Sequence, residues 1–245
     1  MVRFLNAGDR SLTVEFGNEI KEEIHRQVMA LDARLSAAAL PGIVETVPTY
    51  RSLTVLFDPA VLRRAALERA IEAMTADAQA EETSSRTVLE IPVLYGGEAG
   101  PDLAFVAEHA GMTEEEVIRR HSETEYRIYM LGFLPGFTYL GGMDEAIAAP
   151  RLEKPRTKIP AGSVGIAGTQ TGVYPLESPG GWRLIGRTPA KLYDPSREEP
   201  ILTRAGDYIR FRPITAEEFA RLEAAAEAGE SVTVRREEAE HGHSN

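Results

Sequence analysis

The sequence contains no cysteine. Disulfide bonds, thiolate catalysis and cysteine-based metal sites are therefore excluded. No apolar run approaches the roughly 20 residues that a bilayer-spanning helix needs. The N-terminal apolar stretch is also too short, and too soon interrupted by polar residues, to be a signal peptide. We therefore expect a cytoplasmic protein without a membrane segment.

Positive charge is also scarce. Lys and Arg number 27 against 38 Asp and Glu, and the net charge is −11. Nucleic-acid backbones demand an excess of cations, so no nucleic-acid partner is expected. Residues 151–212 are an exception, with 11 Lys and Arg against 6 Asp and Glu. This local excess suggests an anionic ligand or an acidic partner surface, although scattered surface charge gives the same count.

Residues 1–80 are predicted to form a small α/β domain. Alternating apolar residues predict strands, and apolar residues spaced by three and four predict helices. His25 falls on the polar face of one helix and is expected to be solvated. Residues 81–86 are polar and are predicted to be a linker. The expected elements are strands at 2–6 and 11–16, a helix at 19–40, strands at 44–47 and 52–57, and a helix beginning at Asp58-Pro59.

Residues 87–230 are predicted to form a second, mostly β domain. Between residues 132 and 186 there are 11 glycines and six prolines, which preclude long helices and favour short strands and tight loops. We interpret this region as a closed, barrel-like domain, so the fold class is α+β. Residues 231–245 are predicted to be a disordered tail. The expected elements are strands at 87–95, 126–133, 163–167, 182–187, 191–193 and 208–212, and helices at 101–109, 114–122 and 215–228.

The two helices at 101–109 and 114–122 have the spacing of a helix-turn-helix motif, which raises DNA binding as an alternative. The second helix would be the recognition helix, and it opens with Glu114, Glu115 and Glu116. Three carboxylates facing DNA phosphates are strongly unfavourable, so we reject this alternative.

The first candidate site is the segment 132–140. Its glycines allow sharp turns and a close approach of the backbone to a ligand. Phe133 and Phe137, with Pro135 and Gly136 between them, could form the apolar wall of a pocket. A core loop packed by aromatic side chains is the alternative interpretation.

The second candidate is the segment 160–175. Its glycine spacing resembles a phosphate loop, but no Gly-Lys-Ser/Thr ending and no long helix follow, so a Walker site is rejected. Free backbone N–H groups, with Ser163, Thr169 and Gln170 as hydrogen-bond donors and acceptors, could instead bind an amide or a carboxylate. Pro160 and Tyr174 are further candidates for this pocket. A set of barrel turns is the alternative.

The third candidate is the segment 178–188, which contains the only tryptophan, Trp182. If 183–187 is a strand, Arg183 and Arg187 lie on one face because the side-chain period is two. Two guanidinium groups on one face, joined by Arg156, suit a carboxylate or a phosphate. An exposed, solvated barrel face is the alternative.

Among the five histidines, His121 is the best acid–base candidate, because it ends a predicted helix close in sequence to the pocket segments. A structural role is the alternative. No spacing of His, Asp and Glu suggests a metal site.

These motifs together resemble the KipI-like family, strongly over about 90–212 and more loosely over 1–80. The matching segments are 95–97, 100–103, 132–140, 150–151, 155–156, 160–175 and 178–188, continued by Asp194-Pro195 and Gly206-Asp207. The resemblance implies a small α/β N-terminal domain followed by a cyclophilin-like β-barrel.

The resemblance also implies a role as one component of a multi-subunit, ATP-dependent 5-oxoprolinase; such a component is also labelled allophanate hydrolase subunit 1. This type of enzyme converts 5-oxo-L-proline, a small anionic amide, to L-glutamate, with ATP as co-substrate and subunits A and C as partners. The resemblance further implies no activity for this chain alone, and no motif locates the ATP site in it. Two alternatives remain: a KipI-type inhibitor of a histidine kinase, and a carboxyltransferase-type component of urea metabolism. A prolyl-isomerase role is rejected because fold alone does not carry function.

Overall fold

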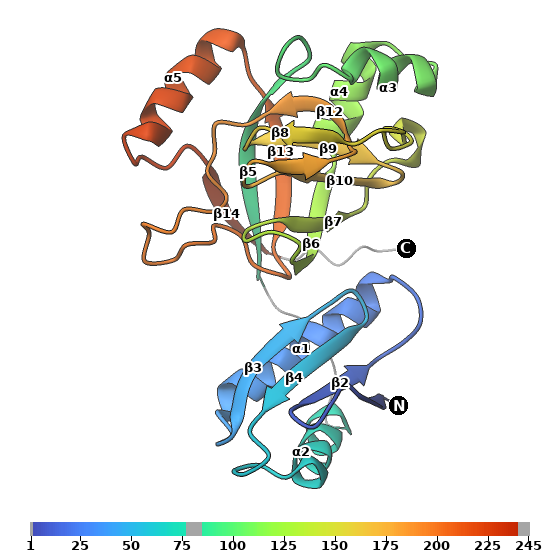
Figure 1. The fold of residues 1–245 in the computed structure, drawn as a ribbon, viewed down its shortest axis with the longest axis vertical. Coiled ribbons are helices and arrows are strands. Elements are labelled where there is room, and N and C mark those ends of the chain that lie inside the picture. Colours follow the sequence, from blue (N-terminus) through green and yellow to red (C-terminus); the bar gives the residue numbers. More distant parts are fainter. Residues whose placement is uncertain (1, 77–84, 240–245) are drawn as a thin grey trace. The chain divides into compact units, whose positions relative to one another are not determined.

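The chain forms two compact units, Met1–Thr83 and Ser84–Asn245. The computed structural model (Figure 1) describes residues 2–76 and 85–239. Residues 81–84 of the predicted linker lie outside the described residues. The other two, Ser85 and Arg86, already belong to the first strand of the second unit, so the linker prediction is wrong for them.

The first unit is a four-stranded antiparallel sheet with two helices, and the strand order is β1-β2-β4-β3. Its core combines alternate residues of β2 and β4 with the apolar stripe of the first helix. The predicted order of strands and helices is confirmed. The elements are β1 (Arg3–Asn6), β2 (Ser11–Glu15), α1 (Glu22–Ala38), β3 (Ile43–Pro48), β4 (Ser52–Phe57) and α2 (Arg64–Ala76).

Two details of this unit differ from prediction. Helix α2 begins at Arg64 rather than at Asp58, because residues 58–63 form turns in which the Asp58 carboxylate accepts a hydrogen bond from the Ala60 N–H at 3.0 Å. His25 is fully buried rather than solvated, and it lies beside Val28 on the inward face of α1.

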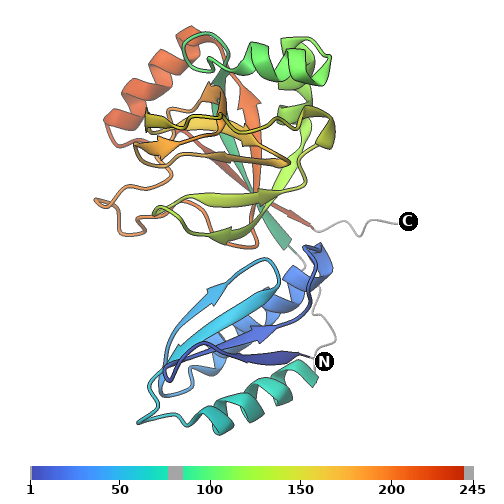
Figure 2. The same ribbon diagram turned by 45° about the vertical axis from the view of Figure 1, so that its right-hand side comes forward.

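The second unit is built on one sheet with the order β10-β9-β12-β5-β13-β6-β7, and β14 pairs with β5 beside this path. β10 and β7 come together, and a Cβ added at Gly172 of β10 would stand 3.3 Å from the Thr138 carbonyl of β7. The sheet therefore nearly closes into a barrel, as Figures 1 and 2 show. The strands are β5 (Ser85–Tyr95), β6 (Glu125–Leu131), β7 (Thr138–Gly141), β9 (Ser163–Ala167), β10 (Gln170–Val173), β12 (Arg183–Arg187), β13 (Tyr208–Pro213) and β14 (Val234–Ala239).

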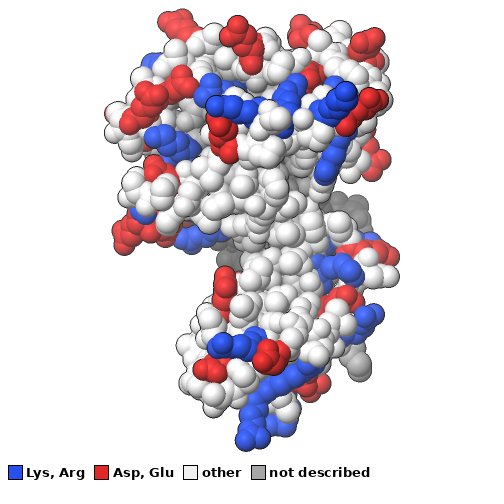
Figure 3. Space-filling view, viewed as in Figure 1, with Lys and Arg blue, Asp and Glu red and all other residues white. Residues whose placement is uncertain are grey.

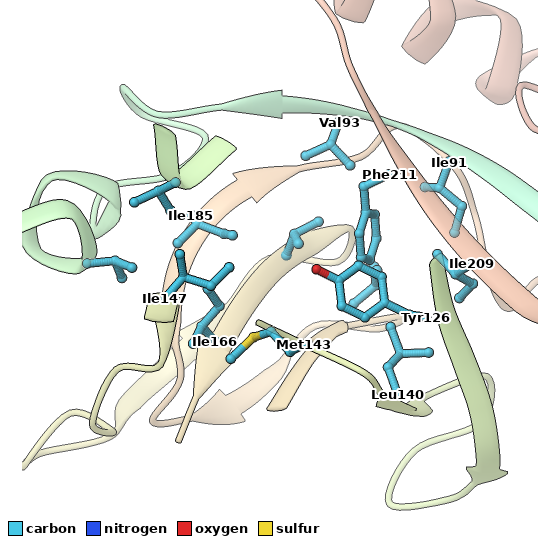
Figure 4. Packing of buried hydrophobic residues seen from close by; sticks show 14 of the residues in the cluster. Ile91, Val93, Tyr126, Leu140, Met143, Ile147, Ile166, Ile185, Ile209 and Phe211 are labelled. Atoms are coloured by element: carbon cyan, nitrogen blue, oxygen red, sulfur yellow. The ribbon is translucent and has the colours of Figure 1, made fainter. Parts of the chain in front are cut away.

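The interior of the barrel is filled by apolar side chains drawn from several of its strands. Figure 4 shows Ile91, Ile166, Ile185, Ile209 and Phe211 pointing toward one another. All five are buried to within 1% of full burial, so the interior is a packed core and not a channel. Any ligand site must therefore lie on the outside or at an end of the barrel.

Three α-helices, one short 3-10 helix and a small sheet surround the barrel within the described residues. The turn before α4 and the turn before α5 each carry a threonine cap: the Thr113 and Thr215 hydroxyls accept hydrogen bonds from the Glu116 and Glu218 N–H groups, both at 3.2 Å. The remaining elements are α3 (Leu103–Ala110), α4 (Glu114–Glu123), η1 (Glu145–Ile147), α5 (Ala216–Glu227), and the strand pair β8 (Arg156–Ile159) and β11 (Ser178–Gly180).

The α+β class and the barrel of the second unit are confirmed, but two predictions on this unit are wrong. The predicted disordered tail contains β14, which is held on β5 by the ion pairs Arg86–Glu238 (2.8 Å) and Arg236–Glu90 (3.2 Å). The predicted strand at 191–193 makes only a single bridge, between Tyr193 and Ile201. The charged sequence of β14 is typical of a solvated tail. The residues of β5 that pair with it are distant in the sequence, so the local pattern does not reveal the strand.

Candidate functional site

A cavity of about 450 Å³ opens on the barrel unit. Its lining comes from the end of β5 and the turn that follows, from the β8–β9 region, from β12 and from α5. Four residues predicted from the sequence line it together: Arg156, Pro160, Ser163 and Arg187. Its other lining residues are Leu94, Glu98, Ala99, Pro101, Lys158, Leu184 and Phe219.

Arg187 and Ser163 form the most defined part of the cavity. They are directly opposite each other in the antiparallel β12–β9 ladder, so their side chains share one face. Ser163 is only 2% exposed. Its hydroxyl has no hydrogen-bond partner among the described residues. A guanidinium beside an unused hydroxyl is suited to binding a carboxylate.

The pairing of Arg187 with Ser163 depends on a β-bulge. The β12–β9 register shifts between Leu184 and Gly186, and one extra residue reverses which face the following side chains occupy. The prediction that Arg183 and Arg187 share a face is therefore wrong. Arg183 instead lies over the Phe105 ring of α3, at 3.5 Å from its centroid.

Arg156 is fixed by Asp102, which precedes α3. One carboxylate oxygen of Asp102 accepts from the Arg156 guanidinium at 3.0 Å, and the other accepts from the Leu184 N–H at 2.7 Å. Asp102 is 8% exposed and the Arg156 side chain is 29% exposed, so the carboxylate of this ion pair is largely shielded from solvent and the guanidinium only in part. Arg156 therefore holds α3, β8 and β12 together at the cavity wall. Asp102 was not predicted as a site residue, because nothing in its local sequence indicates this distant partner.

The other charges of the cavity are more exposed. Lys158 pairs with Glu177 at 2.9 Å, and both side chains are more than half exposed. Glu98 is the cavity's own acidic side chain. Figure 3 shows Lys and Arg side chains gathered across the upper part of the barrel unit between α5 and α3, with acidic side chains around them. The basic segment 151–212 therefore supplies three cations to the cavity, and the described lining contains one anion.

The predicted aromatic residues form a separate cluster. The Phe137 ring makes edge contacts with Tyr174 and Trp182 at 5.9 and 5.7 Å between centroids. All three are buried, and burial raises the pKa of the Tyr174 hydroxyl. The cluster adjoins the cavity through Leu184, which belongs to both. These aromatic side chains thus support the cavity wall without lining it.

Phe133, Pro135, Gly136 and Gln170 also lie outside the cavity lining. Phe133 is 65% exposed and has a left-handed backbone with φ of 64°, which is unusual for a residue with a side chain. Gly136 packs its backbone against Leu192 and Tyr193. Gln170 opens β10 at the hairpin with β9. The structure therefore does not bring these four residues to the same site as Arg187.

His121 lies in the barrel interior, with none of its surface exposed. Nε2 is 2.7 Å from the Thr171 hydroxyl, and that hydroxyl donates to the Gly165 carbonyl at 3.1 Å. Nε2 must therefore be the donor to Thr171, and Nδ1 must accept from the Tyr95 hydroxyl at 2.7 Å. Burial lowers the pKa of His121 to about 3, so the ring is neutral at physiological pH.

Such a residue cannot reach a ligand in the cavity, and we therefore omit His121 from the proposed site. Among the described residues no histidine lines the cavity, and Ser163 and Glu98 supply the hydroxyl and carboxyl groups of its lining. Within 2–76 and 85–239, no group of three or more His, Cys, Asp and Glu side chains could hold a metal ion. No helix of the described part is long and apolar enough to span a membrane.

Fold and cavity together define a two-unit α+β protein whose barrel carries a basic cavity suited to a small anion. The family model for the carboxyltransferase domain, subdomain C and D, matches residues 2–203, so the chain belongs to this family.

Three similar proteins place it more narrowly. It is 44% identical over 222 residues to the 5-oxoprolinase B subunit of Bacillus subtilis, covering 86% of this chain and 92% of that protein. It is 45% identical over 207 residues to the 5-oxoprolinase B subunit of Escherichia coli O157:H7, covering 84% and 93%. The solved structure of TTHA0988 superimposes with a TM-score of 0.75 at 40% identity, over 88% of this chain and 41% of that one. The predicted resemblance to the 5-oxoprolinase B subunit is thereby confirmed, and the chain spans about two fifths of the length of TTHA0988.

Proposed function

We propose that this chain is the B subunit of an ATP-dependent 5-oxoprolinase, which converts 5-oxo-L-proline to L-glutamate together with subunits A and C. The observation that carries the proposal is the 44% identity to the 5-oxoprolinase B subunit of Bacillus subtilis over 92% of that protein's length. The basic cavity adds a physical reason, because 5-oxo-L-proline is a small amide that carries a carboxylate.

In this proposal the cavity binds and orients the carboxylate. Arg187 neutralises the charge, and the Ser163 hydroxyl donates the second hydrogen bond. Arg156, locked by Asp102, holds the wall against which the ring of the substrate packs. We place the groups that activate the lactam carbonyl in the partner subunits, and we therefore expect no activity from the chain alone.

ATP is proposed to bind elsewhere in the complex. The glycine-rich segment that resembles a phosphate loop forms the β9–β10 hairpin, with Gly172 opposite Gly165. It therefore does not present a helix N-terminus to a phosphate, as a Walker loop does. Since ATP is the co-substrate, the proposal includes the cytoplasmic location predicted from the sequence.

A carboxyltransferase role in urea metabolism is the second candidate, because the matching family model describes a carboxyltransferase domain. Deletion of the gene separates the candidates, with growth measured on 5-oxoproline and on urea as sole nitrogen source. The proposal predicts that growth on 5-oxoproline is lost while growth on urea is unchanged, and that the wild-type gene restores growth on 5-oxoproline. Unimpaired growth on 5-oxoproline refutes it, and a selective defect on urea favours the carboxyltransferase. Normal growth on both, with capture of a histidine kinase by the purified chain, favours the kinase inhibitor.

A further inference from the structure

Arg187 is a cavity cation whose acidic partner is exposed and held by a single contact. Its guanidinium is 3.5 Å from the Glu223 carboxylate of α5, and the two side chains are 41% and 40% exposed. The guanidinium also lies 5.7 Å from the centroid of the Phe219 ring, one helical turn earlier on α5. Its Nε also donates a hydrogen bond to the Ala161 carbonyl at 3.4 Å. The Arg187 side chain is thus held in place by contacts that do not require Glu223.

The other two cations of the cavity differ from Arg187 in one respect each. Arg156 shares its carboxylate partner, Asp102, with the backbone N–H of Leu184, so releasing it would also break a buried hydrogen bond. Lys158 lies on β8 and does not face Ser163 in the β12–β9 ladder. Of the three, Arg187 combines an exposed, single-contact ion pair with an adjacent hydroxyl that has no partner among the described residues.

We propose that Glu223 is a built-in competitor for the carboxylate of the ligand. In the free protein the Glu223 carboxylate forms an ion pair with Arg187. A ligand carboxylate must displace Glu223 to bind both Arg187 and Ser163. Glu223 thereby lowers the affinity for a ligand that carries a carboxylate and leaves the affinity for the uncharged lactam unchanged. This inference rests on the proposed function for the identity of the ligand, and it adds the group that competes with it.

Helix α5 is built in a way that permits this exchange. Its first turns are anchored by the Thr215 cap, by the Arg212–Glu218 ion pair at 2.8 Å and by Phe219, which is 8% exposed. Glu223 lies beyond these anchors, so its side chain can leave Arg187 without displacing the helix.

The test measures ligand binding to the full chain by isothermal titration calorimetry. The probes are 5-oxo-L-proline and 2-pyrrolidinone, the same lactam without its carboxylate. Glu223→Gln removes the competing charge and keeps the shape of the side chain. Glu227→Gln is the matched control, because it removes one carboxylate a single turn further along α5 and has no ion pair among the described residues.

We expect Glu223→Gln to bind 5-oxo-L-proline about two- to fivefold more tightly than Glu227→Gln, since an exposed ion pair changes an equilibrium constant by at most about fivefold. Affinity for 2-pyrrolidinone should be equal in the two variants. In an Arg187→Ala background the advantage of Glu223→Gln should disappear. Equal or weaker binding of 5-oxo-L-proline by Glu223→Gln, or no binding by either variant, would overturn the inference. The growth test of the proposed function does not involve Glu223, so the two failures remain distinguishable.

Discussion

The buried hydrogen-bond chain through His121 makes the stability of the barrel depend on pH in a defined direction. Tyr95 donates to Nδ1, Nε2 donates to Thr171, and Thr171 donates to the Gly165 carbonyl. The chain joins β5, α4, β10 and β9, and every donor in it is used once. Protonation of Nδ1 would place a second donor against the Tyr95 hydroxyl and a positive charge in an apolar core, beside the Phe211 ring at 4.7 Å.

The magnitude follows from the two pKa values. The pKa of His121 is about 3 in the folded protein because of burial, and about 6.5 in the unfolded chain. Between these values the unfolded chain binds a proton that the folded protein does not, so the free energy of unfolding falls as pH falls. The His121 contribution is fully present above about pH 6.5 and decreases by roughly 2 kcal/mol at pH 5 and by roughly 3 kcal/mol at pH 4.

The assay is urea unfolding at pH 8 and pH 5, followed by the fluorescence of Trp182, the only tryptophan, which lies in the barrel unit. Carboxylates also contribute to the pH dependence, so the informative quantity is the difference between proteins. His121→Gln should lower stability at pH 8 and remove about 2 kcal/mol of the loss between pH 8 and pH 5. His109→Gln is the control, because His109 lies at the end of α3 outside the core. An unchanged pH dependence in His121→Gln would refute the reasoning.

Three further predictions concern the packing that positions the cavity. Gly100→Ala should prevent folding or lower the melting temperature strongly, because its Cβ would overlap the Ile185 carbonyl, whereas Gly132→Ala should fold normally, because no atom lies closer than 3.7 Å. Asp102→Ala should destabilise the barrel by about 2–3 kcal/mol in urea unfolding, because it leaves a guanidinium and a backbone N–H without their shared partner; a loss below about 1 kcal/mol would contradict the role assigned to it. Deletion of 234–245 should lower stability and promote aggregation measured by light scattering, since it uncovers the edge of β5.

The elements predicted well are those whose pattern is local. The β1–β2 hairpin, α1, β5, α4 and β9 follow from apolar spacing and turn residues in their own sequence. The short strands β7, β8, β10 and β11 were not predicted, because three or four residues between glycines and prolines show no periodicity. β14 was missed for a different reason: its stability comes from charges on β5, about 150 residues away in the chain.

Part of the lining of the candidate cavity was predicted. Arg156, Pro160, Ser163 and Arg187 were found because a basic, glycine-rich segment signals an anion site, and the structure brings them to one cavity. The bulge in β12 could not be read from the sequence, and it turns Arg183 away from Arg187. The acidic partners Asp102 and Glu223 were missed, since each meets its arginine only through tertiary packing.

Reconstitution of the complex tests the central claim most directly. The purified chain is mixed with subunits A and C and ATP, and phosphate release is measured with and without 5-oxo-L-proline. We predict release that depends on 5-oxo-L-proline and requires all three proteins, and that falls about 10- to 100-fold in kcat/KM with Arg187→Ala, the loss of one charge-assisted contact. The proposed function is contradicted if subunits A and C reach the full rate without this chain, or if the complete mixture releases no phosphate in response to 5-oxo-L-proline.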